Sequence, residues 1–346
     1  MIRKAFNKVA LLFGLTIFGL ALSVPANAAA EEVNVYSARK AQLIAPLLED
    51  FSAQTGIQVN LITGKADALL KRLQLEGKNS PADVLVTTDA GRLYRAQAEG
   101  VLQAAMSAEN RQMVPANLQD KSGYWLGLTK RSRVIVYAKD RVDPNELSSY
   151  EALADSKWKG RICVRSSNNI YNQSLVASML AQQGPAATEK WAQGFVSNFA
   201  RKPRGGDRDQ IKAVAAGLCD IALVNTYYLG KMINGKDAAQ QQAADKVALF
   251  WPNQNDRGAH INISGIAITQ SAQNIDNANK LIQFMLSKQA QTWYAQVNNE
   301  YPVITDAELS ETLQNWGDFK GDEINLEKLG ELNAQAVKLM DRAGWR

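Results

Sequence analysis

Between residues 31 and 100, short apolar runs alternate with longer segments in which apolar residues recur every three or four positions. The short runs predict strands at 33–36, 58–62 and 83–87. The longer segments predict helices at 41–55, 66–76 and 90–98. A β-α-β-α-β series of this kind predicts a mostly parallel sheet with helices on both faces.

The same alternation continues to the end of the chain. Further strands are expected at 133–137, 161–164, 220–224, 247–251 and 261–268. Further helices are expected at 172–183, 185–200, 209–216, 274–286 and 289–297, and the tail 309–346 has a polar helical pattern. No repeat or low-complexity linker separates these elements, so we expect an α/β fold of two lobes that share crossover strands.

Residues 1–28 have the pattern of a signal peptide. Arg3, Lys4 and Lys8 precede an apolar run from Ala10 to Val24, and Ala26-Asn-Ala28 fits a small-x-small cleavage site. The apolar run is short for a membrane helix, and an uncleaved anchor is the alternative. No later segment approaches the ~20 apolar residues that span a bilayer. We therefore expect a secreted, soluble mature protein.

Charge gives no reason to expect nucleic acid as a partner. The chain has 39 Lys and Arg against 34 Asp and Glu residues, and three of the basic residues lie in the signal segment, which leaves 36 against 34. A nearly neutral protein offers no bulk attraction to nucleic acid or to an anionic membrane. Its length corresponds to roughly two domains.

Only two cysteines are present, Cys163 and Cys219. Each lies beside a predicted strand. In an oxidising compartment two such residues suggest one disulfide. Two buried free thiols are the alternative.

Three polar segments follow predicted strands directly. They contain Tyr36-Ser-Ala-Arg39, Asn169-Ile-Tyr171 and Asn225-Thr-Tyr227-Tyr228. Tyr227 and Tyr228 cannot share one face of a regular strand, so we expect them at a strand-to-loop bend, where both rings could turn to one ion. In an open α/β sheet, ligands bind beyond the carboxyl ends of the strands, so these segments are candidates for a binding site.

The tyrosines suggest ferric iron as the ligand. A phenolate is a hard anionic oxygen donor that matches a hard trivalent cation. The free pKa of tyrosine is about 10, so binding by Tyr171, Tyr227 and Tyr228 would release protons and weaken in acid. Ordinary packing of these rings is the alternative that spacing alone leaves open.

Three phenolates leave part of an octahedral ion open for a small synergistic anion such as carbonate. Arg39 and Arg131 are candidates to hold it, because the planar guanidinium binds oxyanions through two hydrogen bonds.

At these residues the chain resembles the periplasmic ferric-ion-binding proteins of ABC importers, which have the type 2 periplasmic-binding-protein fold. The likeness rests on six segments: 33–40 (VNVYSARK), 80–88 (SPADVLVTT), 166–176 (SSNNIYNQSLV), 206–212 (GDRDQIK), 224–229 (VNTYYL) and 262–265 (NISG). It implies that Tyr171, Tyr227 and Tyr228 are iron ligands and that Arg39 binds the anion. Arg131 is the better match for a second arginine, and Arg133 is its competitor.

The resemblance also implies two lobes joined by two crossover strands near 129–134 and 256–262. The N-terminal lobe would comprise 31–130 and 262–308, and the C-terminal lobe 131–261 and 309–346. The protein would reside in the periplasm as a monomer and deliver iron to a permease with its cytoplasmic ATPase.

The sequence departs from the family pattern at one place. Many members have His, or His-Tyr, after the Tyr-Ser-x-Arg stretch, whereas this chain has Lys40 and Ala41. The N-terminal lobe is therefore expected to supply no direct iron ligand. We expect Tyr36 to be structural, and His260 to pack in the hinge or behind the ligands.

Two further residues near the third strand are not expected to be ligands. Asp83 is expected to cap or brace a loop, and Asp89 has no predicted iron contact.

Other functions are less compatible with these residues. The chain has no G-x-S-x-G, P-loop or H-E-x-x-H motif and only one histidine, so we do not expect an enzyme. A binding protein of the same fold for a polyamine, thiamine, sulfate or an organophosphonate is the main alternative. A sensor that presents its ligand-bound surface to a receptor would share the same site.

Overall fold

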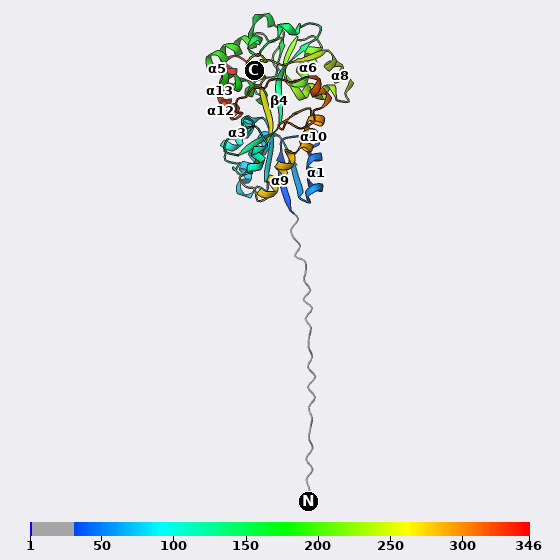
Figure 1. Ribbon diagram of the computed structural model, residues 1–346. Helices are drawn as coiled ribbons and strands as arrows, with labels where there is room; N and C mark the ends of the chain where they lie inside the picture. Colours follow the sequence, from blue (N-terminus) through cyan, green and yellow to red (C-terminus); the bar gives the residue numbers. More distant parts are fainter. Residues whose placement is uncertain (2–30) are drawn as a thin grey trace. The chain divides into compact units, whose positions relative to one another are not determined.

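The computed structural model describes Met1 and residues 31–346 (Figure 1). The predicted signal peptide lies almost entirely outside the described residues. Within the described part, no helix combines the length and apolarity that a membrane crossing requires.

Within residues 31–346, nine strands form one mixed sheet in the order β2-β1-β3-β8-β4-β6-β5, with β7 and β9 also paired to β4. The strands are β1 (Glu32–Ser37), β2 (Gln58–Thr63), β3 (Val84–Thr88), β4 (Trp125–Ala138), β5 (Ile162–Cys163), β6 (Ile221–Asn225), β7 (Val247–Phe250), β8 (Ile261–Ile268) and β9 (Tyr301–Pro302). The predicted parallel pairing occurs between β1 and β2, β1 and β3, and β5 and β6. The long strands β4 and β8 run antiparallel to their neighbours.

Strand β4 connects two parts of the sheet. Its residues up to Ser132 pair with β8, and its residues from Arg133 pair with β6. We call β1–β3, β8 and β9 with the helices packed on them the first lobe, and β5–β7 with theirs the second lobe. The change of partner falls inside the predicted crossover 129–134. The exact lobe boundaries remain predictions.

The main helices are α1 (Ala45–Thr55), α2 (Ala66–Glu76), α3 (Ala90–Ala98), α5 (Ile170–Ser197), α6 (Asp207–Ala215), α7 (Thr226–Ile233), α8 (Ala238–Asp245), α9 (Ile275–Met285), α10 (Lys288–Asn298) and α13 (Asn333–Arg342). The shorter ones are α4 (Ala108–Gln112), α11 (Glu311–Asn315) and α12 (Glu327–Glu331). Figure 1 shows α1, α3, α9 and α10 around one half of the described region, and α5, α6, α8 and α13 around the other.

Helix α5 contains the break that the sequence predicts. Gly184 has φ 76° and ψ 174°, outside the helical region, and Pro185 follows it. The left-handed φ is available to glycine without steric cost, and proline starts a new helical turn readily. The two predicted helices, 172–183 and 185–200, are therefore the two arms of one bent element.

Apolar side chains cover both faces of the second-lobe sheet. Ile135 and Leu223 belong to the large core that runs through both lobes. Val134 and Val224 face a separate core beneath α6, α7 and α8. This alternation follows from the period of two along a strand and explains why these strands are apolar throughout.

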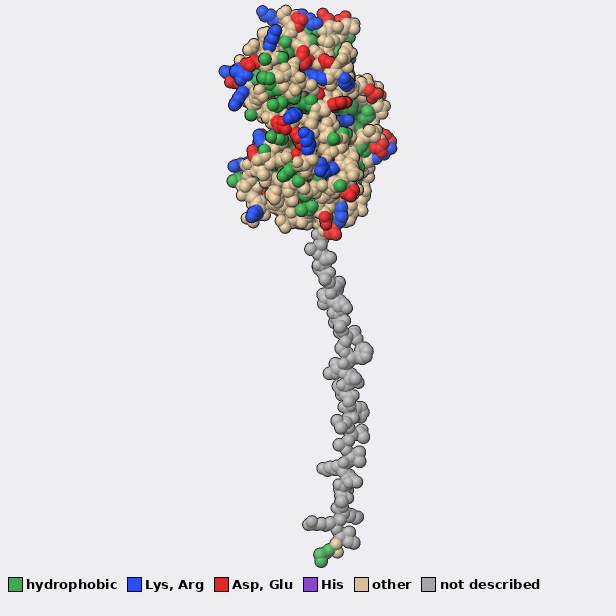
Figure 2. Space-filling view, turned by 60° about the vertical axis from the view of Figure 1, so that its left-hand side comes forward, with side chains coloured by type: hydrophobic (Ala, Val, Ile, Leu, Met, Phe, Trp, Pro, Cys, Tyr) green, Lys and Arg blue, Asp and Glu red, His purple; other side chains and the backbone are tan. Residues whose placement is uncertain are grey.

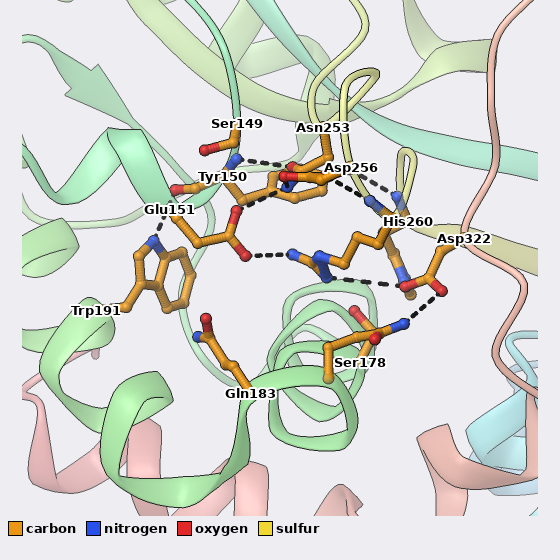
Figure 3. A network of polar contacts seen from close by, with 12 residues as sticks. Ser149, Tyr150, Glu151, Ser178, Gln183, Trp191, Asn253, Asp256, His260 and Asp322 are labelled. Carbon is orange, nitrogen blue, oxygen red and sulfur yellow. Dashed lines mark hydrogen bonds and ion pairs between the residues drawn. The ribbon is translucent and has the colours of Figure 1, made fainter.

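A partly buried polar network braces the segment between β7 and β8, where the second crossover was predicted (Figure 3). Arg257 pairs with Glu151 at 2.6 Å and lies 3.8 Å from an oxygen of Asp322. Asn253 accepts a hydrogen bond from the backbone N–H of Tyr150 at 3.0 Å and donates to Glu151 at 2.8 Å. These contacts fix the crossover segment to the second lobe and to the tail.

The tail contacts both lobes. The backbone N–H of Leu326 donates to Asn117 at 3.0 Å, and Glu327 accepts from the N–H of Lys121 at 2.6 Å, both in the first lobe. Helix α13 packs along α5, and the indole of Trp345 donates to the carbonyl of Arg165 at 2.9 Å in the second lobe. The tail is therefore a further connection between the lobes.

Charges are mixed on the surface. Figure 2 shows basic and acidic side chains interspersed over the visible face. This distribution agrees with the nearly balanced composition beyond the signal segment.

Cys163 and Cys219 form a disulfide, as predicted, with Cα atoms 5.8 Å apart. Cys163 ends β5, and Cys219 lies two residues before β6. Because β5 and β6 are parallel neighbours, the bridge ties the edge strand to the sheet.

We predict that the double substitution Cys163→Ala/Cys219→Ala lowers the free energy of unfolding by about 4 kcal/mol, because the bridge closes a sequence separation of 56 residues. Urea unfolding followed by circular dichroism measures this. Cys163→Ala alone should lose a similar amount, since either change breaks the bridge. Equal midpoints for the variants and the oxidised protein would contradict the prediction.

Candidate metal centre

A cavity of about 550 Å³ lies between the two lobes. Its first-lobe wall includes Arg39, Lys40, Thr88 and Glu300. Its second-lobe wall includes Tyr171, Arg208, Tyr227, Tyr228 and Lys231. All three predicted tyrosine ligands therefore face one space, and we refer to them together as the tyrosine triad.

Tyr227 and Tyr228 lie in the first turn of α7, directly after β6 ends at Asn225. The sequence pattern predicted a strand followed by a loop, and the structure has a strand followed by a helix. Their rings lie with centroids 4.4 Å apart and planes tilted by 36°. The sharp change of direction at the helix start lets both neighbouring rings reach the cavity.

Tyr171 comes from the first turn of α5 and is distant from the other two in sequence. Its hydroxyl lies 3.3 Å from the hydroxyl of Tyr227. Two helix N-termini, those of α5 and α7, thus meet at the triad. Their free backbone N–H groups favour negative charge at this point.

Burial keeps the phenols of Tyr227 and Tyr228 neutral in the absence of a cation. Burial, and then the neighbouring Tyr171, raise the pKa of Tyr228 to about 12. The same two causes raise the pKa of Tyr227 well above its ordinary value. At neutral pH both groups are therefore protonated, and only a nearby cation would make the phenolate form favourable.

Arg131 lies behind the triad on β4 and is 2% exposed. One terminal nitrogen, Nη1, donates to the hydroxyl of Ser264 at 3.3 Å, while Nε and Nη2 are buried without a hydrogen-bond partner. Its guanidinium lies 5.3 Å from the ring centre of Tyr171. A buried guanidinium with two free donors is suited to an oxyanion.

Arg39 lines the cavity from the first lobe, and most of its donors are occupied. Nη2 pairs with Glu300 at 2.9 Å, and Nη1 donates to Ser264 at 2.8 Å. Burial lowers the pKa of Arg39, and the carboxylate of Glu300 outweighs this, so that the pKa is raised overall. Only Nε is without a partner.

Arg133, the competitor of Arg131, is like Arg131 not one of the residues that line the cavity. Its guanidinium pairs with Asp207 at 2.9 Å and donates to Asn172 at 2.6 Å. The alternation of side chains along β4 places Arg131 and Arg133 on one face, and their partners separate them: Arg131 has free donors, whereas Arg133 is engaged on both terminal nitrogens.

Two cationic side chains of the cavity wall were not predicted from the sequence. The guanidinium of Arg208 lies 6.0 Å from the ring centre of Tyr228, and the ammonium of Lys231 lies 5.8 Å from that of Tyr227. Burial, partly offset by Glu300, lowers the pKa of Lys231 to about 8. Placing the tyrosine pair on a helix would have revealed Lys231, because residues three or four apart share a helix face.

The residues expected to be structural lie outside the cavity wall. The hydroxyl of Tyr36 donates to Glu76 at 3.0 Å. His260 is 2% exposed, and burial, with Arg133 and Arg257 nearby, lowers its pKa to about 3. It is therefore neutral at physiological pH.

Both aspartates near β3 brace the backbone. Asp83 accepts from the N–H groups of Gln273 and Asn274, each at 2.9 Å. Asp89 caps α3 and accepts from the hydroxyl of Ser174 on α5 at 2.8 Å, which links the two lobes. Neither lines the cavity. Among residues 31–346, no cluster of three or more His, Cys, Asp or Glu side chains could hold a metal ion.

Comparison with known proteins adds independent information. Residues 79–321 match the family model described as bacterial extracellular solute-binding protein. Iron uptake protein A1 of Synechocystis is 49% identical over 316 residues, which cover 91% of this chain and 88% of that protein.

Two solved structures have the same fold. Trichodesmium FutA in complex with iron and citrate has a TM-score of 0.89 and 49% identity, over 91% of this chain and 100% of that one. The ferric binding protein from Campylobacter jejuni has a TM-score of 0.85 and 41% identity, again over 91% of this chain and 100% of that one. These neighbours confirm the predicted two-lobed α/β fold. The chain belongs to the family of bacterial extracellular solute-binding proteins.

Proposed function

We propose that this protein binds ferric iron through the tyrosine triad and delivers it to the permease of an ABC importer. The observation that carries the proposal is the meeting of three phenol groups in one cavity, with the hydroxyls of Tyr171 and Tyr227 3.3 Å apart. Relatives named for iron uptake and ferric binding support the same ligand.

The chemistry of the cavity favours a trivalent cation. Three phenolates supply three negative charges and three hard oxygen ligands. Bringing neutral phenols together in a half-buried space has no evident benefit for stability, whereas an ion bound between them would compensate their desolvation. The helix N-termini of α5 and α7 further stabilise the phenolate form.

A synergistic anion such as carbonate would complete the coordination. Arg131 is the best-placed anion ligand because Nε and Nη2 are free and its guanidinium lies 5.3 Å from the ring centre of Tyr171. Arg39 would contribute chiefly through Nε, since Glu300 and Ser264 occupy its terminal nitrogens. The complex of Trichodesmium FutA with both iron and citrate supports an organic or inorganic anion beside the metal.

The proposed cycle needs no chemistry on the ligand. Iron and the anion would bind to the second lobe, the first-lobe wall with Arg39 and Lys40 would approach, and the closed form would dock on the permease, whose ATPase drives transport. The periplasm is the proposed location, in agreement with the family and with the signal-peptide pattern.

We predict that Tyr228→Phe weakens Fe³⁺ binding by more than about 100-fold, the upper end of what loss of an outer-shell partner costs. The visible absorption of a ferric–phenolate complex should fall with it. Competition titration against a ferric chelate, together with the visible spectrum, measures both.

Tyr36→Phe is the matched control for this experiment, because Tyr36 is a buried tyrosine that bonds to Glu76 away from the cavity. It should keep wild-type affinity and colour. Equal spectra for the wild-type protein and Tyr228→Phe would rule out Tyr228 as a ligand.

Acid should release the metal. The raised pKa values mean that Tyr227 and Tyr228 are protonated before iron binds, so binding releases their protons and affinity falls as the pH falls. Each phenolate ligand contributes about one decade of affinity per pH unit. Calorimetry in buffers of different ionisation enthalpy counts the protons.

Tyr171→Phe should release one proton fewer per iron than the wild-type protein. An identical proton count in the two proteins would contradict the assignment of Tyr171 as a ligand.

Removing the guanidinium of Arg131 should make iron affinity independent of the anion. We predict that Arg131→Met lowers Fe³⁺ affinity by about 10- to 100-fold when carbonate is present, the equivalent of one or two charge-assisted hydrogen bonds. In carbonate-free buffer it should have little effect. Lys139→Met, which removes an exposed cation just after β4, is the control. Equal carbonate dependence in Arg131→Met and the wild-type protein would exclude this role.

A further inference from the structure

A buried ion pair lies in the second lobe beside the triad. Arg133 Nη1 and Asp207 Oδ1 are 2.9 Å apart, and both side chains are at most 1% exposed. Burying two charges costs desolvation free energy that their attraction repays only with good geometry and further hydrogen bonds. The pair is therefore weak evidence for a role in stability alone, and its other contacts show what it holds together.

One set of contacts reaches the segment that carries Tyr227 and Tyr228. Asp207 Oδ1 accepts from the backbone N–H of Asn225 at 3.1 Å. Arg133 Nη1 donates to the side-chain oxygen of Asn225 at 3.1 Å, and Nη2 donates to the carbonyl of Leu223 at 3.1 Å. Both members of the ion pair thus form hydrogen bonds to the end of β6, directly before the tyrosine pair.

The other set reaches the segment that carries Tyr171. Arg133 Nη2 donates to the side-chain oxygen of Asn172 at 2.6 Å, and Asn172 is fully buried. The amide nitrogen of Asn172 donates to the carbonyls of Arg165 at 2.9 Å and Ser166 at 3.2 Å. Asn172 therefore fixes the start of α5 and the loop before it to Arg133.

Asp207 also forms a hydrogen bond to the loop before α5, the helix that carries Tyr171. Its Oδ2 accepts from Arg165 Nη1 at 2.7 Å. The Arg165 guanidinium then lies 5.9 Å from the ring centre of Tyr171. Asp207 thus bridges two arginines, one in the sheet and one in the loop before α5.

We propose that Arg133, Asp207 and Asn172 act together as a positioning unit for the tyrosine triad. The unit includes Asn172, the residue directly after Tyr171, and bonds to Asn225, two positions before Tyr227. It would set the 3.3 Å separation of their hydroxyls before iron arrives. This inference rests on the proposed function, because it assigns the unit to the iron site.

The relative position of α5 and α7 should affect iron affinity, because Tyr171 lies on the first helix and the tyrosine pair on the second. Metal ligands held by outer hydrogen-bond partners commonly lose about 10- to 100-fold in affinity when one partner is removed. Asn172 is the partner best suited to a test, since its removal leaves the ion pair of Arg133 and Asp207 intact.

A double-substitution cycle separates positioning from general support of the fold. Asn172→Ala should weaken Fe³⁺ binding by about 10- to 100-fold in the wild-type background. In the Tyr171→Phe background it should have an effect of less than about threefold, because the ligand that Asn172 positions is already absent. Competition titration on all four proteins gives both values. Asn172→Ala should release as many protons per iron as the wild-type protein, because Tyr171 remains a ligand and is only held less well.

Asn198→Ala is the matched control. Asn198 is also buried in the second lobe, follows the other end of α5, and donates to the carbonyls of Leu153 and Asp155. It should lower the thermal midpoint as Asn172→Ala does, with unchanged iron affinity.

Asp207→Asn is a second variant, and it alters contacts both to the end of β6 and to the loop before α5. It should weaken binding in either background. Equal losses from Asn172→Ala in both backgrounds, or the same loss from Asn198→Ala, would overturn the positioning unit while leaving the iron site in place. Absence of iron binding by the wild-type protein would instead overturn the proposed function and the unit with it.

Discussion

Three phenol groups in one half-buried cavity are the constraint on which the rest of the site depends. Burial makes a lone phenolate unfavourable, and it raises the pKa of Tyr228 to about 12. The same low polarity strengthens the attraction between phenolates and a trivalent cation. Under the proposed function, Tyr227 and Tyr228 would be protonated before the metal arrives and would lose their protons to a hard cation, so that selectivity would follow from the charge and hardness of the ion.

The scaffold supplies geometry from elements that are far apart in sequence. Helices α5 and α7 both begin at the cavity and present free backbone N–H groups there. Strand β4 passes from one lobe to the other and carries Arg131 and Arg133 at the point of passage. The lobes are also joined by the tail and by the bond between Asp89 and Ser174. Closure of the cavity therefore has to occur about segments that already belong to both lobes.

Much of this could be predicted from the sequence, because the signals were local. The apolar periodicity predicted the bounds of α2, and the Gly184-Pro185 pair located the bend in α5. Pairing partners are not local, and so the antiparallel run of β4 and the role of Arg133 could not be predicted. Lys231 was missed because the tyrosine pair was expected at a strand-to-loop bend, where no helical spacing points to neighbours. Arg208 was missed because it lies on α6, and its approach to Tyr228 is a tertiary contact.

The central claim, that phenolate oxygens bind the metal, is tested most directly by resonance Raman spectroscopy of the iron-loaded protein with excitation in its visible band. We predict enhanced ring and C–O vibrations of iron-bound tyrosinate, weakened in Tyr171→Phe. A loaded protein whose spectrum has no tyrosinate vibrations would contradict the claim, whatever its affinity for iron.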